Sequence, residues 1–445
     1  MTHVVVGTLM QAPTPHALEV TAGAVIVVND DGVITEVLRE GTPGADSAVS
    51  VAGRVTRLGT KQRLLPGMID THIHAPQWPQ LGTGLDIPLD RWLFEYTFPL
   101  EARYVDEAFA RTVWSRMVPT LLAHGTTTAV YYGTVHNPAT LALAEQCKES
   151  GQRAFVGRVG MDHPQGTPDW YRDTDAAAGI DASARSVASI RSLGSTLVQP
   201  VITPRFAPAC TDDLLRGLGE LARAEKVLVQ THCSESDWEH GYAYERFGTS
   251  DTVALDSFGL VARGTVLAHG DHLSTPDMDI IKMRGAGVAH CPLSNTYFAN
   301  AVFPLRHALG RGVHVGLGSD VAGGAHPGLL AQCCHAVSAS RHLEDGVDPS
   351  LPPVARGVPE SRVDAVMAFH VATKGGADLL GINAGVIAPG NVFDAFVVDC
   401  DARPGGLDFW EGIDNEERLF EKIVRLAGPS DITDVWVHGE RVAGR

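Results

Sequence analysis

Between residues 64 and 384, short apolar runs alternate with stretches of helical spacing, a pattern typical of parallel βα units. Helices are predicted between the runs, for example over 106–124, over 212–224 after the capping residue Thr211, and over 276–284. Eight runs have the length and flanking turn residues of strands: 64–74, 126–133, 153–159, 196–205, 227–235, 264–270, 285–295 and 314–320. Eight such units close a (β/α)8 or TIM barrel, so we predict an α/β fold of this kind.

The two ends of the chain have a different pattern. Short strands broken by turns are predicted near the N-terminus, for example over 24–28 and 33–37, and similar runs recur at 394–399 and 435–442. We therefore expect segments 1–63 and 385–445 to meet in one small β-sandwich domain. The barrel, residues 64–384, would be inserted between its halves, and the Pro- and Gly-rich stretch 161–174 would form a long loop that is a candidate lid.

Composition narrows the choice of partners and compartment. The formal charge of −17 repels a phosphate backbone, and no basic cluster offsets it, so we expect no nucleic-acid partner. No apolar run reaches the roughly 18–20 residues of a membrane span, and the N-terminus lacks a secretory signal, so we expect no membrane partner. The seven cysteines are scattered and without a CxxC pair, which predicts reduced thiols and a cytoplasmic location.

Residues of the kind that bind metals stand at the ends of several predicted strands. In a TIM barrel the reactive groups lie at the carboxyl ends of the strands. His72 and His74 end the first strand, and because side chains at i and i+2 share a face, both are expected to face the barrel axis. With His232 at the fifth strand and Asp320 at the eighth, they make a set of three imidazoles and one carboxylate. This set suits one Zn²⁺ per chain, with iron as the alternative, and leaves room for a water molecule.

The same residues carry a resemblance to the amidohydrolase superfamily. The run from Leu65 to His74, LPGMIDTHIH, followed in order by strand-end His, His and Asp, is similar to that superfamily's pattern. Binuclear members carry a lysine at the end of strand four, whereas that strand here ends at Arg205, which favours a single metal. Six segments resemble the guanine deaminases in particular: 74–77 (HAPQ), 204–208 (PRFAP), 232–235 (HCSE), 268–270 (AHG), 290–295 (HCPLSN) and 316–324 (GLGSDVAGG).

The resemblance implies a reaction and a role for each residue. The reaction is hydrolytic deamination of guanine to xanthine and ammonia, with water activated at the metal as the nucleophile. Glu235 would move a proton to ring N3, and His269 and Asp320 would orient and deprotonate the water. The resemblance also implies that Gln77, Arg205 and Phe206 contact the small-molecule purine substrate, and that the chain is a homodimer.

Other interpretations stay open at this point. An aminohydrolase acting on another purine, a pterin or a triazine-like heterocycle differs only in the segments around Gln77 and Arg205. A non-catalytic scaffold barrel is a second alternative, although such proteins are expected to have lost metal ligands. For single residues the alternatives are structural: a buried ion pair for Arg205, a core position for Phe206, and loop hydrogen bonding for Asn295.

Overall fold

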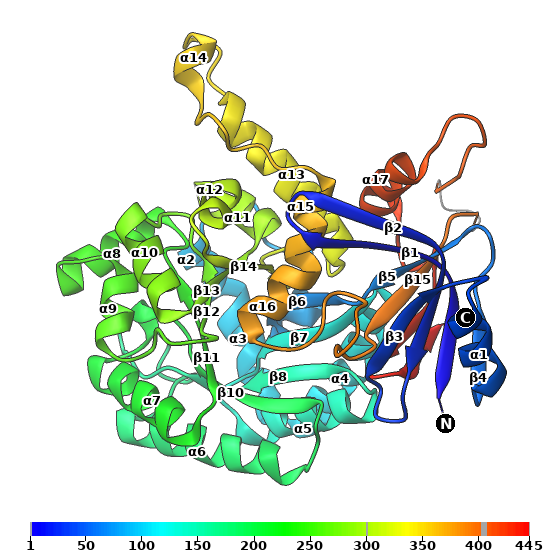
Figure 1. Ribbon diagram of the computed structural model, residues 1–445. Coiled ribbons are helices and arrows are strands. Elements are labelled where there is room, and N and C mark those ends of the chain that lie inside the picture. The colour runs from blue at the N-terminus through cyan, green and yellow to red at the C-terminus, as the bar shows by residue number, and fades with distance from the viewer. Residues whose placement is uncertain (1, 300, 402–406, 445) are drawn as a thin grey trace.

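The computed structural model describes residues 2–299, 301–401 and 407–444. Residues 1, 300, 402–406 and 445, which belong to the two predicted domains, lie outside the described part. The chain folds into a barrel wrapped by helices, with a separate sheet beside it that contains both ends of the chain (Figure 1). None of the described helices is long and apolar enough to cross a membrane.

The barrel is built from parallel strands that are buried on both faces. In the described residues its eight strands are β6 (Met68–His74), β7 (Thr126–Tyr132), β8 (Arg153–Gly157), β10 (Val198–Pro204), β11 (Leu228–Cys233), β12 (Val266–His269), β13 (Gly287–His290) and β14 (His314–Leu317). The sheet closes because β14 pairs with β6 and β10 pairs with β11, while the short β9 (Val159–Gly160) adds to β10. The predicted (β/α)8 barrel is therefore confirmed.

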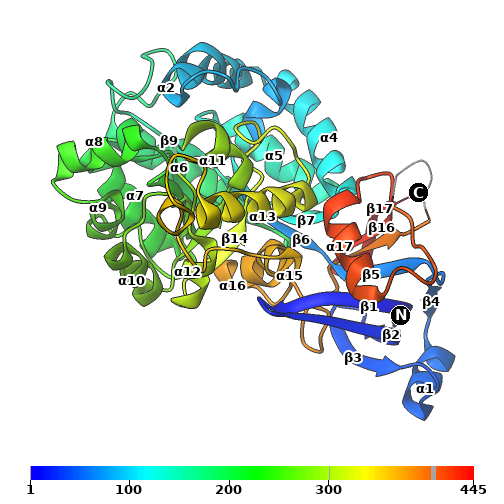
Figure 2. The ribbon, with the colours of Figure 1, turned by 90° about the horizontal axis from the view of Figure 1, so that it is seen from above.

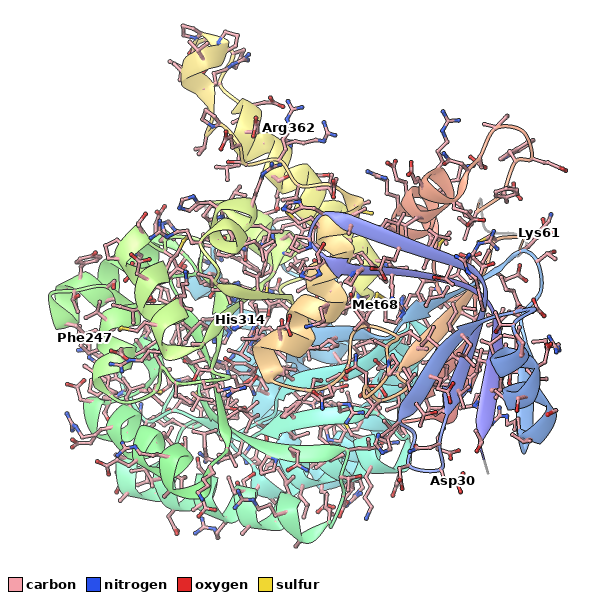
Figure 3. The ribbon with its side chains drawn as sticks, in the orientation of Figure 1. Asp30, Lys61, Met68, Phe247, His314 and Arg362 are labelled. Carbon is pink, nitrogen blue, oxygen red and sulfur yellow. The ribbon has the colours of Figure 1, made fainter. Side chains whose placement is uncertain are left out.

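Helices surround the barrel (Figure 2), and polar side chains cap the starts of several of them, among them the predicted cap Thr211. Thr211 accepts the N–H of Leu214 at the start of α7, and Ser274 forms a reciprocal capping box with Asp277 at the start of α10. The helices between β7 and the C-terminal strands are α5 (Asn137–Glu149), α6 (Ala176–Ser192), α7 (Asp212–Glu225), α8 (Asp237–Phe247), α9 (Asp251–Ser257), α10 (Thr275–Arg284), α11 (Pro292–Phe298), α12 (Leu305–Gly310), α13 (Leu329–Asp345), α14 (Pro353–Arg356), α15 (Ala365–His370), the π-helical turn η5 (Val371–Gly375) and α16 (Gly376–Leu380). The end of α13 and α14 project away from the barrel, and Arg362 lies at this projection (Figures 1 and 3).

A second, mixed sheet joins the two ends of the chain. Its order is β17-β16-β15-β5-β1-β2-β3, with β4 paired to β1. The strands are β1 (His3–Thr14), β2 (Ala17–Val28), β3 (Ile34–Arg39), β4 (Arg54–Arg57), β5 (Gln62–Pro66), β15 (Ala395–Asp399), β16 (Ile432–Val437) and β17 (Glu440–Gly444). One face packs around Phe393 and Trp436, and the other packs under α1 (Pro43–Val51). Near this sheet α17 (Glu416–Leu426) packs against α13 and α15.

The predicted strand over 64–74 is wrong, because the chain forms two strands there. β5 ends at Pro66 and pairs with β1 and β15, whereas β6 begins at Met68 inside the barrel. Gly67 sits at the crossing, where an added Cβ would lie 2.2 Å from Oγ1 of Thr127. Figure 3 places Met68 between the barrel and the terminal sheet. Both strands are buried, so apolar residues continue from the end of β5 into the start of β6, and no polar residue marks the boundary between the two strands. The predicted strand over 285–295 is likewise too long, since β13 ends at His290 and α11 follows.

The segment after β6 carries short helices that no sequence pattern predicts. It comprises η1 (Ala75–Gln80), α2 (Leu89–Trp92), the π-helical η2 (Leu93–Thr97), α3 (Phe98–Ala102) and η3 (Arg103–Val105). The segment leads into α4 (Glu107–Ala123), which Asp106 caps by accepting the N–H of Ala108. In Figure 2 α2 lies apart from the terminal sheet, on the far side of the barrel helices.

Candidate active site

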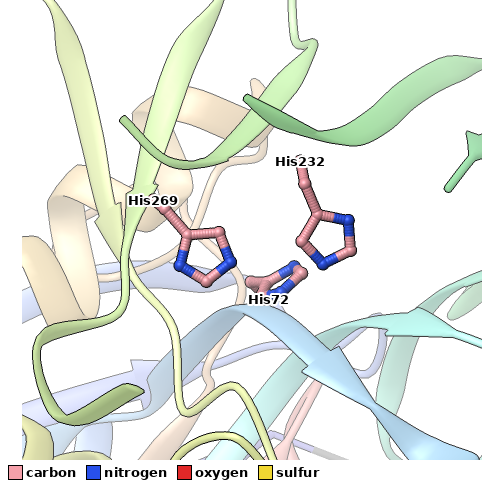
Figure 4. A group of neighbouring side chains, drawn as sticks. All are labelled: His72, His232 and His269. Carbon is pink, nitrogen blue, oxygen red and sulfur yellow. The ribbon is translucent and has the colours of Figure 1, made fainter. Parts of the chain in front are cut away.

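Four imidazoles and a carboxylate converge at the carboxyl ends of the barrel strands. Nε2 of His74 lies 3.0 Å from Nε2 of His232, although β6 and β11 are on different sides of the barrel. Oδ1 of Asp320 lies 3.2 Å from Nε2 of His72 and 3.6 Å from Nε2 of His74. The ring of His269 faces the same point, and Figure 4 shows the rings of His72, His232 and His269 turned toward one another.

These residues fit a metal ion. Two nitrogens bound to one ion at about 2.0–2.1 Å in tetrahedral geometry lie about 3.3 Å apart, close to the separation of the His74 and His232 nitrogens. Nε2 of His72 and Nε2 of His269 are buried without a hydrogen-bond partner. Burial lowers the pKa values of His72, His74 and His232 well below the usual range, so all three are neutral at pH 7, the state that binds metals.

Hydrogen bonds from the surrounding backbone hold the ligands in place. Nδ1 of His232 lies 2.6 Å from the carbonyl oxygen of Arg205, so that nitrogen donates and leaves Nε2 free to coordinate. The N–H of Asp320 donates to the carbonyl of His72 at 2.9 Å, which joins β14 to β6 at the site. Beneath them the buried carboxyl of Asp70 accepts the N–H groups of His72 and Ser319, and burial raises its pKa to about 7.

The proposed proton carriers lie next to the ligands. Nε2 of His269 is 3.7 Å from Oε1 of Glu235 and 4.0 Å from Oδ2 of Asp320. Burial, and secondarily the charge of Asp320, raises the pKa of Glu235 well above its ordinary value. Asn295 accepts from Nδ1 of His269 at 2.9 Å and donates to Asp271 at 2.7 Å, which leaves Nε2 of His269 as the unprotonated nitrogen.

A pocket of about 380 Å³ opens onto this cluster. Five of the side chains that line it are apolar: three come from the segment after β6, one is Phe206, and one comes from α11. The lining residues are His74, Gln77, Leu89, Trp92, Leu93, Arg205, Phe206, His232, Glu235, Ser294, Phe298, Asp320 and Gly323. Residues 161–174, the candidate lid, are not among them; the segment after β6 forms this part of the wall, and a lid role for 161–174 stays a prediction.

Arg205 and Gln77 meet at a carboxylate that the sequence did not single out. The guanidinium of Arg205 donates to both oxygens of Glu101, at 2.6 and 3.1 Å, and its carbon lies 4.9 Å from the centre of the Phe98 ring. Gln77 donates to Glu101 at 3.1 Å and accepts the N–H of Ala322 at 3.0 Å. Burial alone would lower the pKa of Arg205, but the charge of Glu101 and its hydrogen bonds together act in the opposite direction, and the pKa is raised.

Other contacts at the site were also missed. Glu101 lies in the short helix α3, in a segment without sustained periodicity, where one acidic residue among many carries no signal. Ser294 and Gly323 lie inside the segments 290–295 and 316–324 but were not named as site residues, and they line the pocket with Asp320. Phe206 lies at the pocket wall with its ring centre 6.0 Å from that of His232 and 5.8 Å from that of Trp238.

Known proteins share this architecture. A model of the amidohydrolase family matches residues 63–442. The probable guanine deaminase of Schizosaccharomyces pombe is 37% identical over 99% of this chain and 83% of its own length. The guanine deaminase of Dictyostelium discoideum is 32% identical over 98% of this chain and 97% of its own length. The crystal structure of guanine deaminase from C. acetobutylicum with bound guanine in the active site superimposes with a TM-score of 0.88 at 27% identity, covering 99% of this chain and 100% of that one.

The matches cover the barrel, the terminal sheet and every strand that supplies a side chain to the pocket. The family match alone spans far more than half of the chain. The chain therefore belongs to the amidohydrolase family, within the group of the guanine deaminases.

Proposed function

We propose that this protein hydrolyses guanine to xanthine and ammonia. One observation carries the proposal: a single pocket is lined by His74, His232 and Asp320 of the His and Asp cluster, by the buried carboxyl of Glu235, and by the polar side chains of Arg205 and Gln77. A hydrolytic centre and a polar recognition edge therefore face the same small space.

His72, His74, His232 and Asp320 would hold one Zn²⁺ per chain, with iron as the alternative, because their nitrogen and carboxylate donors suit either ion. A bound ion of this kind polarises water and lowers its pKa from 15.7 toward about 7. The residues of the chain then position that water and move its protons.

Asp320 and His269 would orient the water and accept its proton, because Oδ2 of Asp320 and Nε2 of His269 face the same space. Glu235 would deliver a proton to ring N3 while the water oxygen bonds to C2. The proton that Asp320 accepted from the water, passed to the exocyclic nitrogen directly or through Glu235, would let the C2–N bond break. The remaining O–H proton of the adduct would return to the carboxylate of Glu235 as the C2=O bond forms, so that ammonia leaves, xanthine remains and the acid is regenerated. The raised pKa of Glu235 suits a group that carries a proton.

The polar edge of the pocket supports a purine substrate. Arg205 and Gln77 keep N–H donors beyond those that bind Glu101, and a site that hydrogen-bonds a substrate edge rejects analogues that lack it. Phe206 offers an aromatic wall beside the ring.

Two further proposals concern the setting of the enzyme. We place it in the cytoplasm, which is supported by seven cysteines that are all free thiols in the structure. The homodimer implied by the resemblance stays a prediction, and sedimentation equilibrium of the purified chain tests it.

The deciding experiment measures ammonia release from guanine by protein whose zinc and iron content is known for the same sample. Turnover with about one metal per chain supports the proposal. If the metal-loaded chain is inactive on guanine but deaminates another purine, a pterin or a triazine-like heterocycle, that compound is the substrate in place of guanine. A chain that holds no transition metal and gains no activity with zinc would be a scaffold.

A further inference from the structure

We infer that Glu101 is a positioning residue for substrate recognition, which acts by holding Arg205 and Gln77 in the orientation that binds the heterocycle. The inference rests on the proposed function, since it concerns the same pocket. Glu101 does not line the pocket; both residues that it binds do.

Three N–H donors converge on the carboxylate of Glu101. Glu101 accepts two hydrogen bonds from the guanidinium of Arg205 and one from the amide of Gln77, so its two oxygens bind all three donors. A fork of two N–H donors on one carboxylate fixes the plane of the guanidinium as well as its position. The remaining N–H groups of Arg205 are thereby fixed in direction.

Glu101, Gln77 and Arg205 come from separate parts of the fold. Glu101 lies in α3, Gln77 in the turn after β6, and Arg205 directly after β10. The ring of Phe98, one turn before Glu101, lies under the guanidinium. Glu101 therefore ties the segment that forms one pocket wall to the strand end that forms another.

A buried pair of charged side chains is costly in free energy. The side chains of Arg205 and Glu101 are 2% and 0% exposed. Removing two charges from water is expensive, and an apolar pair of similar size is often as stable, so stability alone gives weak reason for a charged pair here. A role in orienting donors toward the pocket accounts for the pair.

Gln77 shows the same ordering effect. Its amide nitrogen donates to Glu101 and its amide oxygen accepts the N–H of Ala322, so the amide cannot flip without losing both bonds. One N–H of Gln77 is left, and its direction is set by Glu101.

The test compares wild type, Glu101→Gln, Arg205→Met and the double variant as metal-loaded holoenzymes. In Glu101→Gln the remaining carbonyl oxygen still accepts from Gln77, whereas the new NH₂ group opposes the guanidinium. We expect kcat/KM for guanine to fall about 10- to 100-fold, mostly through KM, with unchanged metal content. In the Arg205→Met background, Glu101→Gln should lower kcat/KM by less than about 3-fold, because the guanidinium that Glu101 orients is absent.

Two controls separate positioning from stability. Glu101→Asp keeps the charge and should restore part of the lost kcat/KM. Asp173→Asn breaks another buried pair, with Arg158, whose residues do not line the pocket. That variant should lower the melting temperature and leave kcat/KM unchanged.

The inference is overturned if Glu101→Gln keeps wild-type kcat/KM, or if it costs the same factor in both backgrounds. If Glu101→Gln does not fold, the double variant compared with Arg205→Met, together with Glu101→Asp, decides in the same way. If wild type releases no ammonia from guanine, the proposed function fails separately, and the dissociation constants of the same chains for xanthine still show whether Glu101 acts through Arg205. A wild-type chain that binds no xanthine either overturns both.

Discussion

Nε2 of His74 and Nε2 of His232 lie 3.0 Å apart across the mouth of the barrel. Both imidazoles are kept neutral by burial, so two lone pairs face each other unless a proton or a cation lies between them. The carbonyl of Arg205 holds Nδ1 of His232 and therefore selects the tautomer with a free Nε2. The contact is that of an N–H···N hydrogen bond or of two ligands of one ion, and the second fits the proposed metal site.

His232→Ala removes one of these ligands, so we expect the purified chain to retain little zinc or iron and to lose at least about 100-fold in kcat. Metal analysis and ammonia release on the same sample check this result. His314→Ala is the control, because His314 is exposed at the start of β14, and it should leave metal and activity unchanged. If His232→Ala keeps full metal occupancy, His232 is not a ligand of the metal.

Glu235→Gln tests the proton carrier. The amide keeps the shape and lacks the titrating proton, so we expect unchanged metal content and melting temperature with kcat about 10²- to 10⁴-fold lower. Steady-state ammonia release provides the measurement. A rate within a few-fold of wild type would show that another group carries the proton.

The clustering of the candidate metal ligands could be predicted from the sequence, because each of these residues is marked by its position at the end of a strand. His72 and His74 follow the period of two, and His232, His269 and Asp320 stand at the ends of apolar runs, so the barrel brings them together once the strands are recognised. Placing these residues at the mouth of the barrel does not require the exact register of the strands. The wrongly predicted strand boundaries near Gly67 and His290 therefore do not change the predicted cluster.

The pocket wall and Glu101 could not be predicted in the same way. The segment after β6 has no sustained period, and its short helices are held by tertiary contacts such as Trp92 against Phe298, whose ring centres lie 5.2 Å apart. The composition of 161–174 predicts a long loop and a candidate lid, but it does not indicate that Asp173 pairs with Arg158 or that Tyr171 packs against Phe98. Those contacts depend on folded geometry that composition does not encode.

Asn295→Ala tests the hydrogen bond that orients His269. Without the amide oxygen, Nδ1 of His269 loses its acceptor and the ring is free to change tautomer, so we expect kcat to fall about 10- to 100-fold while the metal is retained. Asn137→Ala removes an amide that donates to the carbonyl of Ala182 instead and should not change kcat. Equal kcat in the two variants would mean that Asn295 only supports the packing of α11.

His3 gives a prediction for the pH dependence of stability. Burial, and secondarily the charge of Arg54, lowers its pKa to about 4. The unfolded chain has the ordinary value of about 6.5, so between these values the unfolded state binds a proton that the folded state does not. The contribution of His3 to stability is therefore complete above about pH 6.5 and is lost as the pH falls toward 4, by at most about 1.4 kcal/mol per pH unit.

The measurement compares the melting temperatures of wild type and His3→Gln at several pH values. Glutamine can still hydrogen-bond Oγ1 of Thr56, which lies 2.9 Å from Nε2 of His3. We expect the advantage of wild type over the variant to shrink as the pH falls from 7 to 4.5. A constant difference across that range would mean that His3 titrates normally in the folded chain.

Gly323→Ala tests how closely the backbone must approach the site. A Cβ at this position would lie 2.9 Å from both Oδ2 of Asp320 and Oγ of Ser294, a distance at which something must shift. Asp320 is the proposed ligand and proton acceptor, so we expect kcat to fall about 10- to 100-fold, because displacements of about 1 Å have costs of that size. Gly310→Ala is the matched control, since a Cβ there meets no atom within 4 Å. Its kcat should equal that of wild type. If Gly323→Ala also keeps full kcat, the carboxylate of Asp320 can move without loss, and its fixed position is not required for the reaction.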